Sequence, residues 1–191
     1  MRSSPCLFVF DGFADWEAAY AIAELRRSGG YQVRTLGLTG EPVVSMGGLT
    51  VVPDEELAEA DPELIRILIL PGGDWWLTAE VDPGLTTLIG RLIRGRTPVA
   101  AICGATVGLA RMGFLLGRPH TGNDRQELAK LAPNYGGEAH YVDAPVVRDR
   151  GLITASGLAA VPFAREIFEE LGVFTPEERG EWEALFGGRQ G

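Results

Sequence analysis

Residues 98–110 read Pro98-Val-Ala-Ala-Ile-Cys-Gly-Ala-Thr-Val-Gly-Leu-Ala110, an apolar run followed by small residues. The apolar residues up to Ile102 are typical of a buried strand. Glycine and other small residues follow Cys103, which predicts a tight turn that leads directly into a helix. Such a turn would place the Cys103 side chain at the carboxyl edge of a parallel sheet, where α/β proteins bind their ligands.

Strand and helix patterns alternate on both sides of this stretch, as in a mainly parallel sheet with helices on both faces. Apolar or alternating runs predict strands at residues 6–10, 31–38, 66–70 and 98–102, and hairpins at residues 43–52 and 144–155. Helical spacing predicts helices at residues 14–28, 83–94, 104–112, 127–131, 161–171 and 176–186. We expect one α/β domain over residues 1–191, in which residues 174–191 form a C-terminal helical extension.

The composition narrows the classes of partner. The net charge of −9 opposes binding to nucleic-acid phosphates and favours a neutral or cationic small molecule. No apolar run approaches the roughly 20 residues that span a bilayer, and the first apolar run is too short for a signal peptide. We therefore expect a cytoplasmic protein. Two cysteines and two histidines without ligand-like spacing argue against a metal site.

Cys103 has two interpretations. At the start of a helix, free N–H groups and the helix dipole favour the thiolate, which would lower the thiol pKa from about 8.5. Alternatively, Cys103 is a buried structural residue at the end of a core strand, since free cysteine is often buried. Cys6, which precedes an apolar run without a glycine turn, is interpreted as structural.

Two more strand ends would reach the same edge of the sheet. The turn at residues 71–73, Pro-Gly-Gly, could present free N–H groups to an oxyanion or could be a plain tight turn. Asp15 and Glu17 follow the first strand. One of these carboxyls could turn inward to the cysteine, or both could simply stabilise the start of a helix.

Two further features could belong to the same site. His120, in the loop after the cysteine helix, could serve as a base for the thiol or lie at the surface. Trp75 and Trp76, after the glycine pair, could wall a pocket, cover a dimer surface or be ordinary partly buried aromatics.

Together, these motifs resemble the ThiJ/PfpI superfamily, within the class I glutamine amidotransferase-like fold. The motifs that carry the resemblance occur in the family's order: Asp15-Trp-Glu17, Leu70-Pro-Gly-Gly73, Ala101-Ile-Cys-Gly104, His120-Thr-Gly-Asn123 and Leu152-Ile-Thr-Ala-Ser-Gly157. The arrangement is most similar to the bacterial branch named for intracellular proteases and amidotransferases. The resemblance implies a three-layer sandwich with a flavodoxin-like, mainly parallel sheet, and a homodimer.

The resemblance also implies roles for individual residues. Cys103 would be the nucleophile, and Glu17 the buried carboxyl that hydrogen-bonds its thiolate and must be protonated to donate that bond. The N–H groups of Gly73 and Gly104 would match the oxyanion site, and His120 could act as a substitute for the family's loop histidine. The residues expected around the pocket are Asp15, Gly72, Trp75 and Thr121.

The sequence departs from the family pattern in ways that bear on function. Proteolytic members carry a histidine after the cysteine, where this chain has Gly104, and an acidic residue near the position of Leu77. Glutaminases need a His-x-Glu pair near the chain end, and residues 151–191 contain no histidine. Peptidase and glutaminase activities are therefore disfavoured.

Three hypotheses follow. In the first, Cys103 attacks a small electrophilic substrate by hydrolase, hydratase or glyoxalase-type chemistry, with no cofactor or metal. In the second, Cys103 is oxidised to a sulfinic acid in a redox-sensing stress-response protein. In the third, the fold is a ligand-binding module without catalysis.

Overall fold

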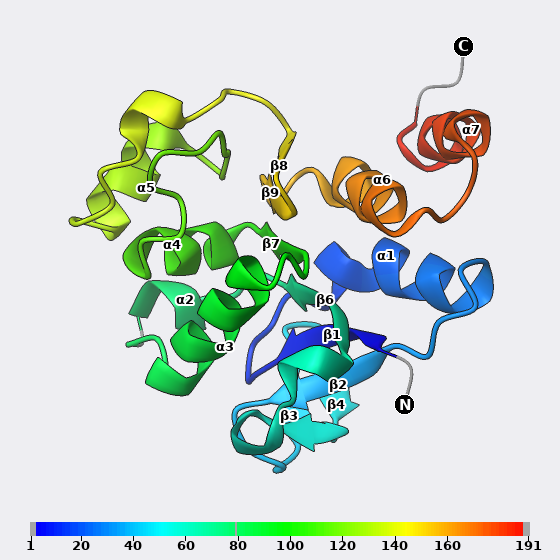
Figure 1. The fold of residues 1–191 in the computed structure, drawn as a ribbon, viewed down its shortest axis with the longest axis horizontal. Helices are drawn as coiled ribbons and strands as arrows, with labels where there is room; N and C mark the ends of the chain where they lie inside the picture. The colour runs from blue at the N-terminus through cyan, green and yellow to red at the C-terminus, as the bar shows by residue number, and fades with distance from the viewer. Residues whose placement is uncertain (1–2, 79, 189–191) are drawn as a thin grey trace.

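The computed structural model describes residues 3–78 and 80–188. Its centre is a seven-stranded sheet with the order β5-β2-β1-β6-β7-β9-β8 (Figure 1). The strands are β1 (Ser4–Val9), β2 (Arg34–Gly37), β5 (Glu55–Glu56), β6 (Ile65–Leu70), β7 (Val99–Ile102), β8 (Val146–Asp149) and β9 (Leu152–Ala155). All neighbouring strands run parallel except β8, which pairs antiparallel with β9. A separate hairpin pairs β3 (Val43–Val44) with β4 (Thr50–Val51).

Helices cover both faces of the sheet, which confirms the expected α/β class. They are α1 (Asp15–Arg27), α2 (Trp75–Thr78), α3 (Pro83–Arg94), α4 (Gly104–Arg111), α5 (Arg125–Leu131), α6 (Ala160–Leu171) and α7 (Pro176–Phe186), with 3-10 turns η1 (Leu57–Glu59), η2 (Pro62–Leu64) and η3 (Glu138–His140). Helices α1 and α6 lie side by side on one face, and α2, α3 and α4 lie on the other (Figure 1).

The core is built from strands that are apolar on both faces because both faces are covered. All four residues of β7 and all four of β9 are buried. Burying each leucine or isoleucine stabilises the fold by about 1.5–3 kcal/mol. The central strands therefore form a rigid frame that ends at the Cys103 turn.

Two of the differences from the predicted elements have a clear physical reason. The second strand begins at Arg34 rather than at Tyr31, because the Tyr31 N–H donates to the Leu25 carbonyl (3.0 Å) and completes the end of α1. The single-turn helix α2 was not predicted. It is held by the buried Trp76, whose Nε1–H donates to the Pro71 carbonyl at 2.8 Å.

The C-terminal helix α7 packs on its own chain. The Trp182 ring lies 4.9 Å from that of Phe168 on α6, and its Nε1–H donates to Glu24 on α1 at 3.3 Å. Thr175 and Glu178 form a capping box that begins the helix. Residues 189–191 of the predicted extension lie outside the described residues, and the division of the chain into domains stays a prediction.

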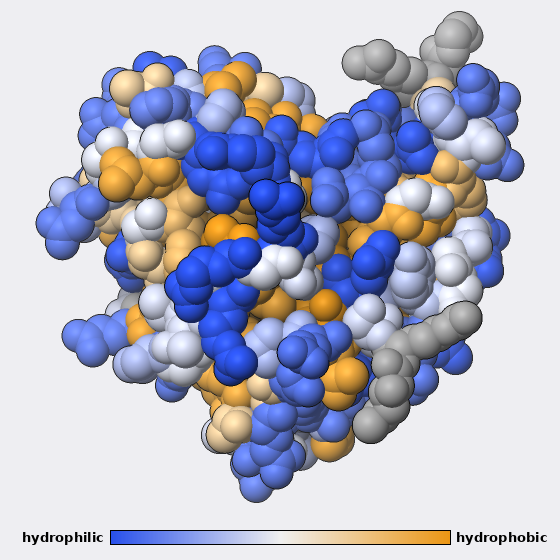
Figure 2. Space-filling view, in the orientation of Figure 1, coloured by the Kyte–Doolittle hydropathy of each residue, from blue (hydrophilic) through white to orange (hydrophobic). Residues whose placement is uncertain are grey.

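The surface is mainly hydrophilic on the face that Figure 2 shows, with smaller hydrophobic patches between the hydrophilic residues. Within the described residues, none of the helices has the length and apolar character needed to cross a membrane.

Candidate active site

Cys103 lies on the turn between β7 and α4, in a backbone conformation that is unusual for a side-chain-bearing residue. Its φ is 57° and its ψ is −127°. The turn is held by the Cys103 N–H, which donates to the Ala155 carbonyl (3.0 Å), and by the Thr106 hydroxyl, which donates to the Cys103 carbonyl (2.7 Å). Strained residues of this kind persist only where the surroundings enforce them, and they are frequent at active sites.

Glu17 lies in the first turn of α1, and its side chain is buried beside the cysteine. Its Oε2 accepts the Gly72 N–H at 2.6 Å, and its carboxyl is hydrogen-bonded to Cys103. A side chain at Gly72 would be excluded, since its Cβ would lie 2.7 Å from both Cys103 Cβ and Glu17 Oε2. The pKa of Glu17 is raised, because burial disfavours its charged form more than the hydrogen bonds from Gly72 and Cys103 favour it.

The thiol pKa differs from the sequence-based expectation. Burial raises the pKa of Cys103, and the Glu17 charge and hydrogen bond act in the same direction. Hydrogen bonds from Asn123 and from the Gly104 N–H act against them. Two acids in contact titrate as a pair. The raised pKa values of both groups are consistent with one proton shared by Sγ and the carboxyl. Either the thiol donates to the carboxylate, or the carboxylic acid donates to the thiolate.

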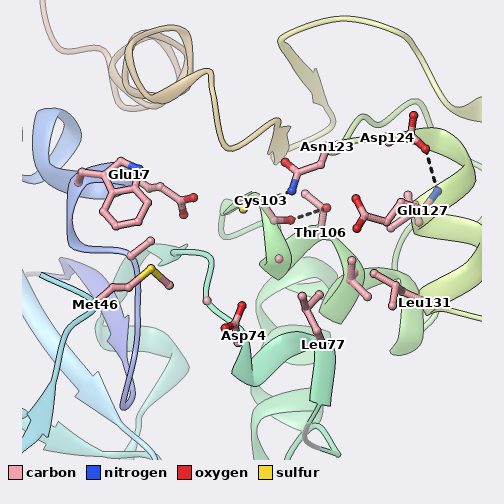
Figure 3. A pocket seen from close by; sticks show the side chains of 16 residues that line it. Glu17, Met46, Asp74, Leu77, Cys103, Thr106, Asn123, Asp124, Glu127 and Leu131 are labelled. Carbon is pink, nitrogen blue, oxygen red and sulfur yellow. Dashed lines mark hydrogen bonds between the residues drawn. The ribbon is translucent and has the colours of Figure 1, made fainter.

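Cys103 and Glu17 line a pocket of about 260 Å³ at the carboxyl edge of the sheet (Figure 3). Val107, Leu128 and Leu131 form an apolar wall, and Trp16 and Met46 lie on the α1 side. The acidic side chains that line it are Glu17, Asp74, Asp124 and Glu127. The described lining contains no lysine, arginine or histidine. The pocket thus offers an apolar wall, carboxylates and one nucleophile.

Gly73 and Gly104 both line this pocket, next to the sulfur. A Cβ at Gly104 would lie 2.9 Å from the Gly73 carbonyl oxygen and 3.4 Å from the Gly73 nitrogen, so the two backbones touch. Gly73 has a φ of 151°, which favours glycine. The structure therefore places these two glycines side by side at the pocket.

Asn123 is a site residue that sequence reasoning quoted only as the end of a motif. Its Nδ2 donates to Cys103 Sγ at 3.3 Å, and its Oδ1 accepts the Gly157 N–H at 2.8 Å. In Figure 3 the amide is directed at the cysteine. The only signal in the sequence was its place in the loop after the cysteine helix.

His120 is buried away from the pocket lining. Its Nδ1 pairs with the Arg118 carbonyl at 2.8 Å, and its Nε2 pairs with the Tyr135 hydroxyl. A carbonyl only accepts, so Nδ1 carries the proton and Nε2 accepts from Tyr135. Burial lowers the pKa of His120. The structure thus engages both ring nitrogens elsewhere and does not bring them to the sulfur.

The other residues expected around the pocket lie behind its wall. Asp15 accepts hydrogen bonds from the Ser45 hydroxyl (2.5 Å) and the Gly47 N–H (3.1 Å), and so holds the β3–β4 hairpin that carries Met46. Thr121 is buried, and its hydroxyl donates to the Ala144 carbonyl at 2.8 Å.

Trp75 and Gly72 also lie behind the lining. The Trp75 ring packs on Phe10, with ring centroids 5.3 Å apart. Gly72 does not line the pocket itself, but its N–H donates to Glu17, which does.

Across residues 3–78 and 80–188, no group of three or more His, Cys, Asp or Glu side chains is arranged to hold a metal ion.

Comparison with known proteins gives a consistent family match. A sequence model of the DJ-1/PfpI family matches residues 4–170. The chain is 40% identical over 187 residues to a protein named "Uncharacterized protease YoaZ" of Bacillus subtilis, covering 94% of this chain and 88% of that protein. It is similar to a crystal structure of a thiJ/pfpI family protein from Bacillus anthracis, with a TM-score of 0.89, 38% identity, and coverage of 97% and 90% of the two chains.

More distant relatives have names that describe activities. A protein named "Deglycase TK1284" of Thermococcus kodakarensis is 27% identical, covering 76% of this chain and 84% of that protein. A protein named "Glutathione-independent glyoxalase DJR-1.2" of Caenorhabditis elegans is 27% identical, covering 75% of each chain.

Proposed function

The chain belongs to the DJ-1/PfpI family, and from this we propose that it is an enzyme whose Cys103 sulfur attacks a small electrophilic carbon, with Glu17 as its proton partner. The observation that carries the proposal is the contact of Cys103 with the buried Glu17 carboxyl at the base of a pocket. A strained turn that presents a nucleophile beside an acid is typical of covalent catalysis.

The first step can be written for an aldehyde or a dicarbonyl. The thiol proton passes to Glu17, the sulfur electron pair forms a C–S bond, and the carbonyl π pair moves to oxygen. That oxyanion would lie near the N–H groups of Gly73 and Gly104. Glu17 then returns the proton to the oxygen, and the product is a thiohemiacetal.

Several observations support a small carbonyl substrate over a peptide. The pocket holds about 260 Å³, below the usual volume of drug-sized sites, roughly 300–1,000 Å³. Gly104 follows the cysteine where proteolytic members carry a histidine. Relatives named deglycase and glyoxalase have names consistent with carbonyl chemistry. We assign the substrate only to the class of small reactive aldehydes and dicarbonyls.

The test is turnover of a panel of small aldehydes and α-dicarbonyls by the wild-type chain and three variants. Cys103→Ser should remove turnover, and Glu17→Gln should lower it by roughly 10²-fold or more, the usual contribution of a positioned acid or base. Cys6→Ser is the matched control, since Cys6 is buried and its pKa is raised to about 12 by burial. Turnover that survives Cys103→Ser would refute the proposal.

A redox role is the second candidate, favoured by the donors that surround the sulfur. Peroxide would oxidise the thiolate to a sulfenic acid, releasing water, and a second peroxide would give the sulfinic acid. The Asn123 amide, the Gly104 N–H and a protonated Glu17 carboxyl could donate to sulfinate oxygens. A mass increase of two oxygens on Cys103 but not on Cys6, without carbonyl turnover, would favour this role.

Two expectations about the whole protein stay predictions. We propose a homodimer, which light scattering after size-exclusion chromatography would detect, and a cytoplasmic location. Ligand binding without dependence on Cys103 or Glu17 would favour the third hypothesis, a binding module.

A further inference from the structure

The Asn123 amide is oriented by two different partners. The Gly157 N–H can only donate, so the amide oxygen must face it, at 2.8 Å. The amide nitrogen therefore faces Cys103 Sγ, at 3.3 Å. Gly157 is itself close to the reacting pair, since a Cβ there would lie 2.8 Å from Cys103 Sγ and 3.2 Å from Glu17 Oε1.

Hydrogen bonds fix the residues on both sides of Asn123 in its loop. The Thr121 N–H donates to the Thr154 hydroxyl (2.9 Å), and the Tyr141 hydroxyl donates to the Gly122 carbonyl (3.1 Å). On the other side, Asp124 caps α5 by accepting the Glu127 N–H at 2.8 Å. A donor held from both sides is already in place for a developing negative charge and needs no reorganisation.

The chemistry of an amide limits what Asn123 can do. An amide N–H donates to a thiolate but does not accept or release a proton in the working pH range. Among the residues that the structure describes, Glu17 is the only titratable side chain hydrogen-bonded to the Cys103 sulfur. When the S–H bond breaks, the electron pair stays on sulfur and the proton forms an O–H bond on the Glu17 carboxylate, so no other reactant is needed.

Resting on Cys103 as the reactive group of the proposed function, we propose that Asn123 is a catalytic residue that stabilises the thiolate through its fixed N–H. In this arrangement Glu17 alone exchanges a proton with the sulfur. The competing explanation is structural: Asn123 only clamps Gly157, and its nitrogen is a bystander.

Asn123→Asp and Asn123→Ala separate the two explanations only together, because aspartate also brings a negative charge that raises the thiol pKa by itself. Aspartate keeps an oxygen for the Gly157 N–H, so the clamp survives, but it replaces the donor at the sulfur with a carboxylate oxygen. Asn123→Ala removes both bonds. Asn134→Asp is the matched control, because it makes the same charge change at an exposed position outside the pocket lining. All variants are made in a Cys6→Ser background, so that one thiol reports.

The measurement is the rate of Cys103 carbamidomethylation by iodoacetamide as a function of pH. We expect the midpoint of the profile to move upward by about one pH unit or more in Asn123→Asp, the scale of one lost hydrogen bond to a charged group. Asn123→Ala should move it in the same direction, and Asn134→Asp should leave it in place. Titration of the thiolate ultraviolet absorbance gives the same midpoint by a second method.

An unchanged midpoint in either variant would overturn the inference. Asn123→Asp loses the donor and keeps the clamp, and Asn123→Ala loses the donor without adding a charge. If Asn123→Asp fails to fold, an unchanged midpoint in Asn123→Ala still overturns the inference, because that variant also lacks the donor. The experiment needs no substrate, so it is independent of turnover. A midpoint that moves in a protein that turns over no carbonyl would support the role of Asn123 and refute the proposed enzyme.

Discussion

At Glu17, the burial of one carboxyl couples folding to pH. The raised pKa means that the folded protein binds the Glu17 proton more tightly than the unfolded chain does. The neutral carboxyl therefore stabilises the fold at low pH, and this contribution is lost as the pH rises from about 4 through the folded-state pKa.

Glu17→Gln should remove this dependence, because the amide stays neutral and still offers an oxygen to the Gly72 N–H. We expect the free energy of unfolding of the variant, relative to that of the wild type, to increase as the pH rises from about 4 to about 7. Urea unfolding at several pH values measures the difference. A constant difference would show that Glu17 titrates normally.

His120 and Asn123 show where prediction of individual residues ends. Cys103, Glu17 and Gly73 were predicted to meet because each follows a parallel strand, and those strand ends share one edge of the sheet. The loop residues depend instead on contacts with distant parts of the chain. The Tyr135 hydroxyl engages His120, and Thr154 and Tyr141 hold the loop that presents Asn123. No local pattern contains that information.

At the scale of elements, the helix α4 depends on having no side chain where it meets α2. A Cβ at Gly108 would lie 2.2 Å from Trp76 Cε3 and 2.6 Å from its Cζ3. Trp76 is fully buried and holds the turn that carries Gly73. The small residues after Cys103 thus let the cysteine helix pack against the glycine turn, which fixes one half of the site against the other.

Gly108→Ala should therefore destabilise the protein by about 1–3 kcal/mol through overpacking, although alanine favours a helix over glycine by about 1 kcal/mol. Gly180→Ala in α7 is the matched control, since no atom lies within 4 Å of its Cβ position, and we expect it to stabilise by about 0.5–1 kcal/mol. Urea unfolding distinguishes them. The same sign for both would mean that Trp76 moves aside at little cost.

Prediction of elements succeeded where the pattern was long or where glycines marked a hairpin, and it failed for two short elements without such a signal. Helices α3 and α7 were predicted with the bounds they have, because each begins with a proline in its first turn and keeps helical spacing. Strand β5 has two residues and α2 has four, too few for any period to appear. These short elements form because the sheet edge and Trp76 hold them.

At the scale of the molecule, charge and pocket act together on anything that approaches Cys103. The chain has a net charge of −9, and Asp74 and Glu127 direct carboxylates into the pocket (Figure 3). Such a field lowers the local concentration of anions and raises that of cations. Neutral and cationic electrophiles should therefore reach the sulfur more readily than anionic ones.

Iodoacetamide and iodoacetate, which differ mainly in charge, test this selectivity. We expect the ratio of their rates at Cys103 to exceed the ratio for a free thiol several-fold, and to fall with added salt. Glu127→Gln and Asp74→Asn should each reduce the ratio. Glu177→Gln, on exposed α7, makes the same charge change away from the pocket. A ratio equal to that of the free thiol would remove charge as a source of specificity.

The half-exposed indole of Trp16 on the pocket wall provides an intrinsic fluorescence signal for ligand binding. Trp76 and Trp182 are buried, and Trp75 packs on the Phe10 ring away from the lining. A ligand that enters the pocket changes the solvent around Trp16 first, so its emission and its quenching by acrylamide follow occupancy without an added label. Binding can thus be followed separately from chemistry, in real time, in a Cys103→Ser variant that holds a ligand but cannot react with it.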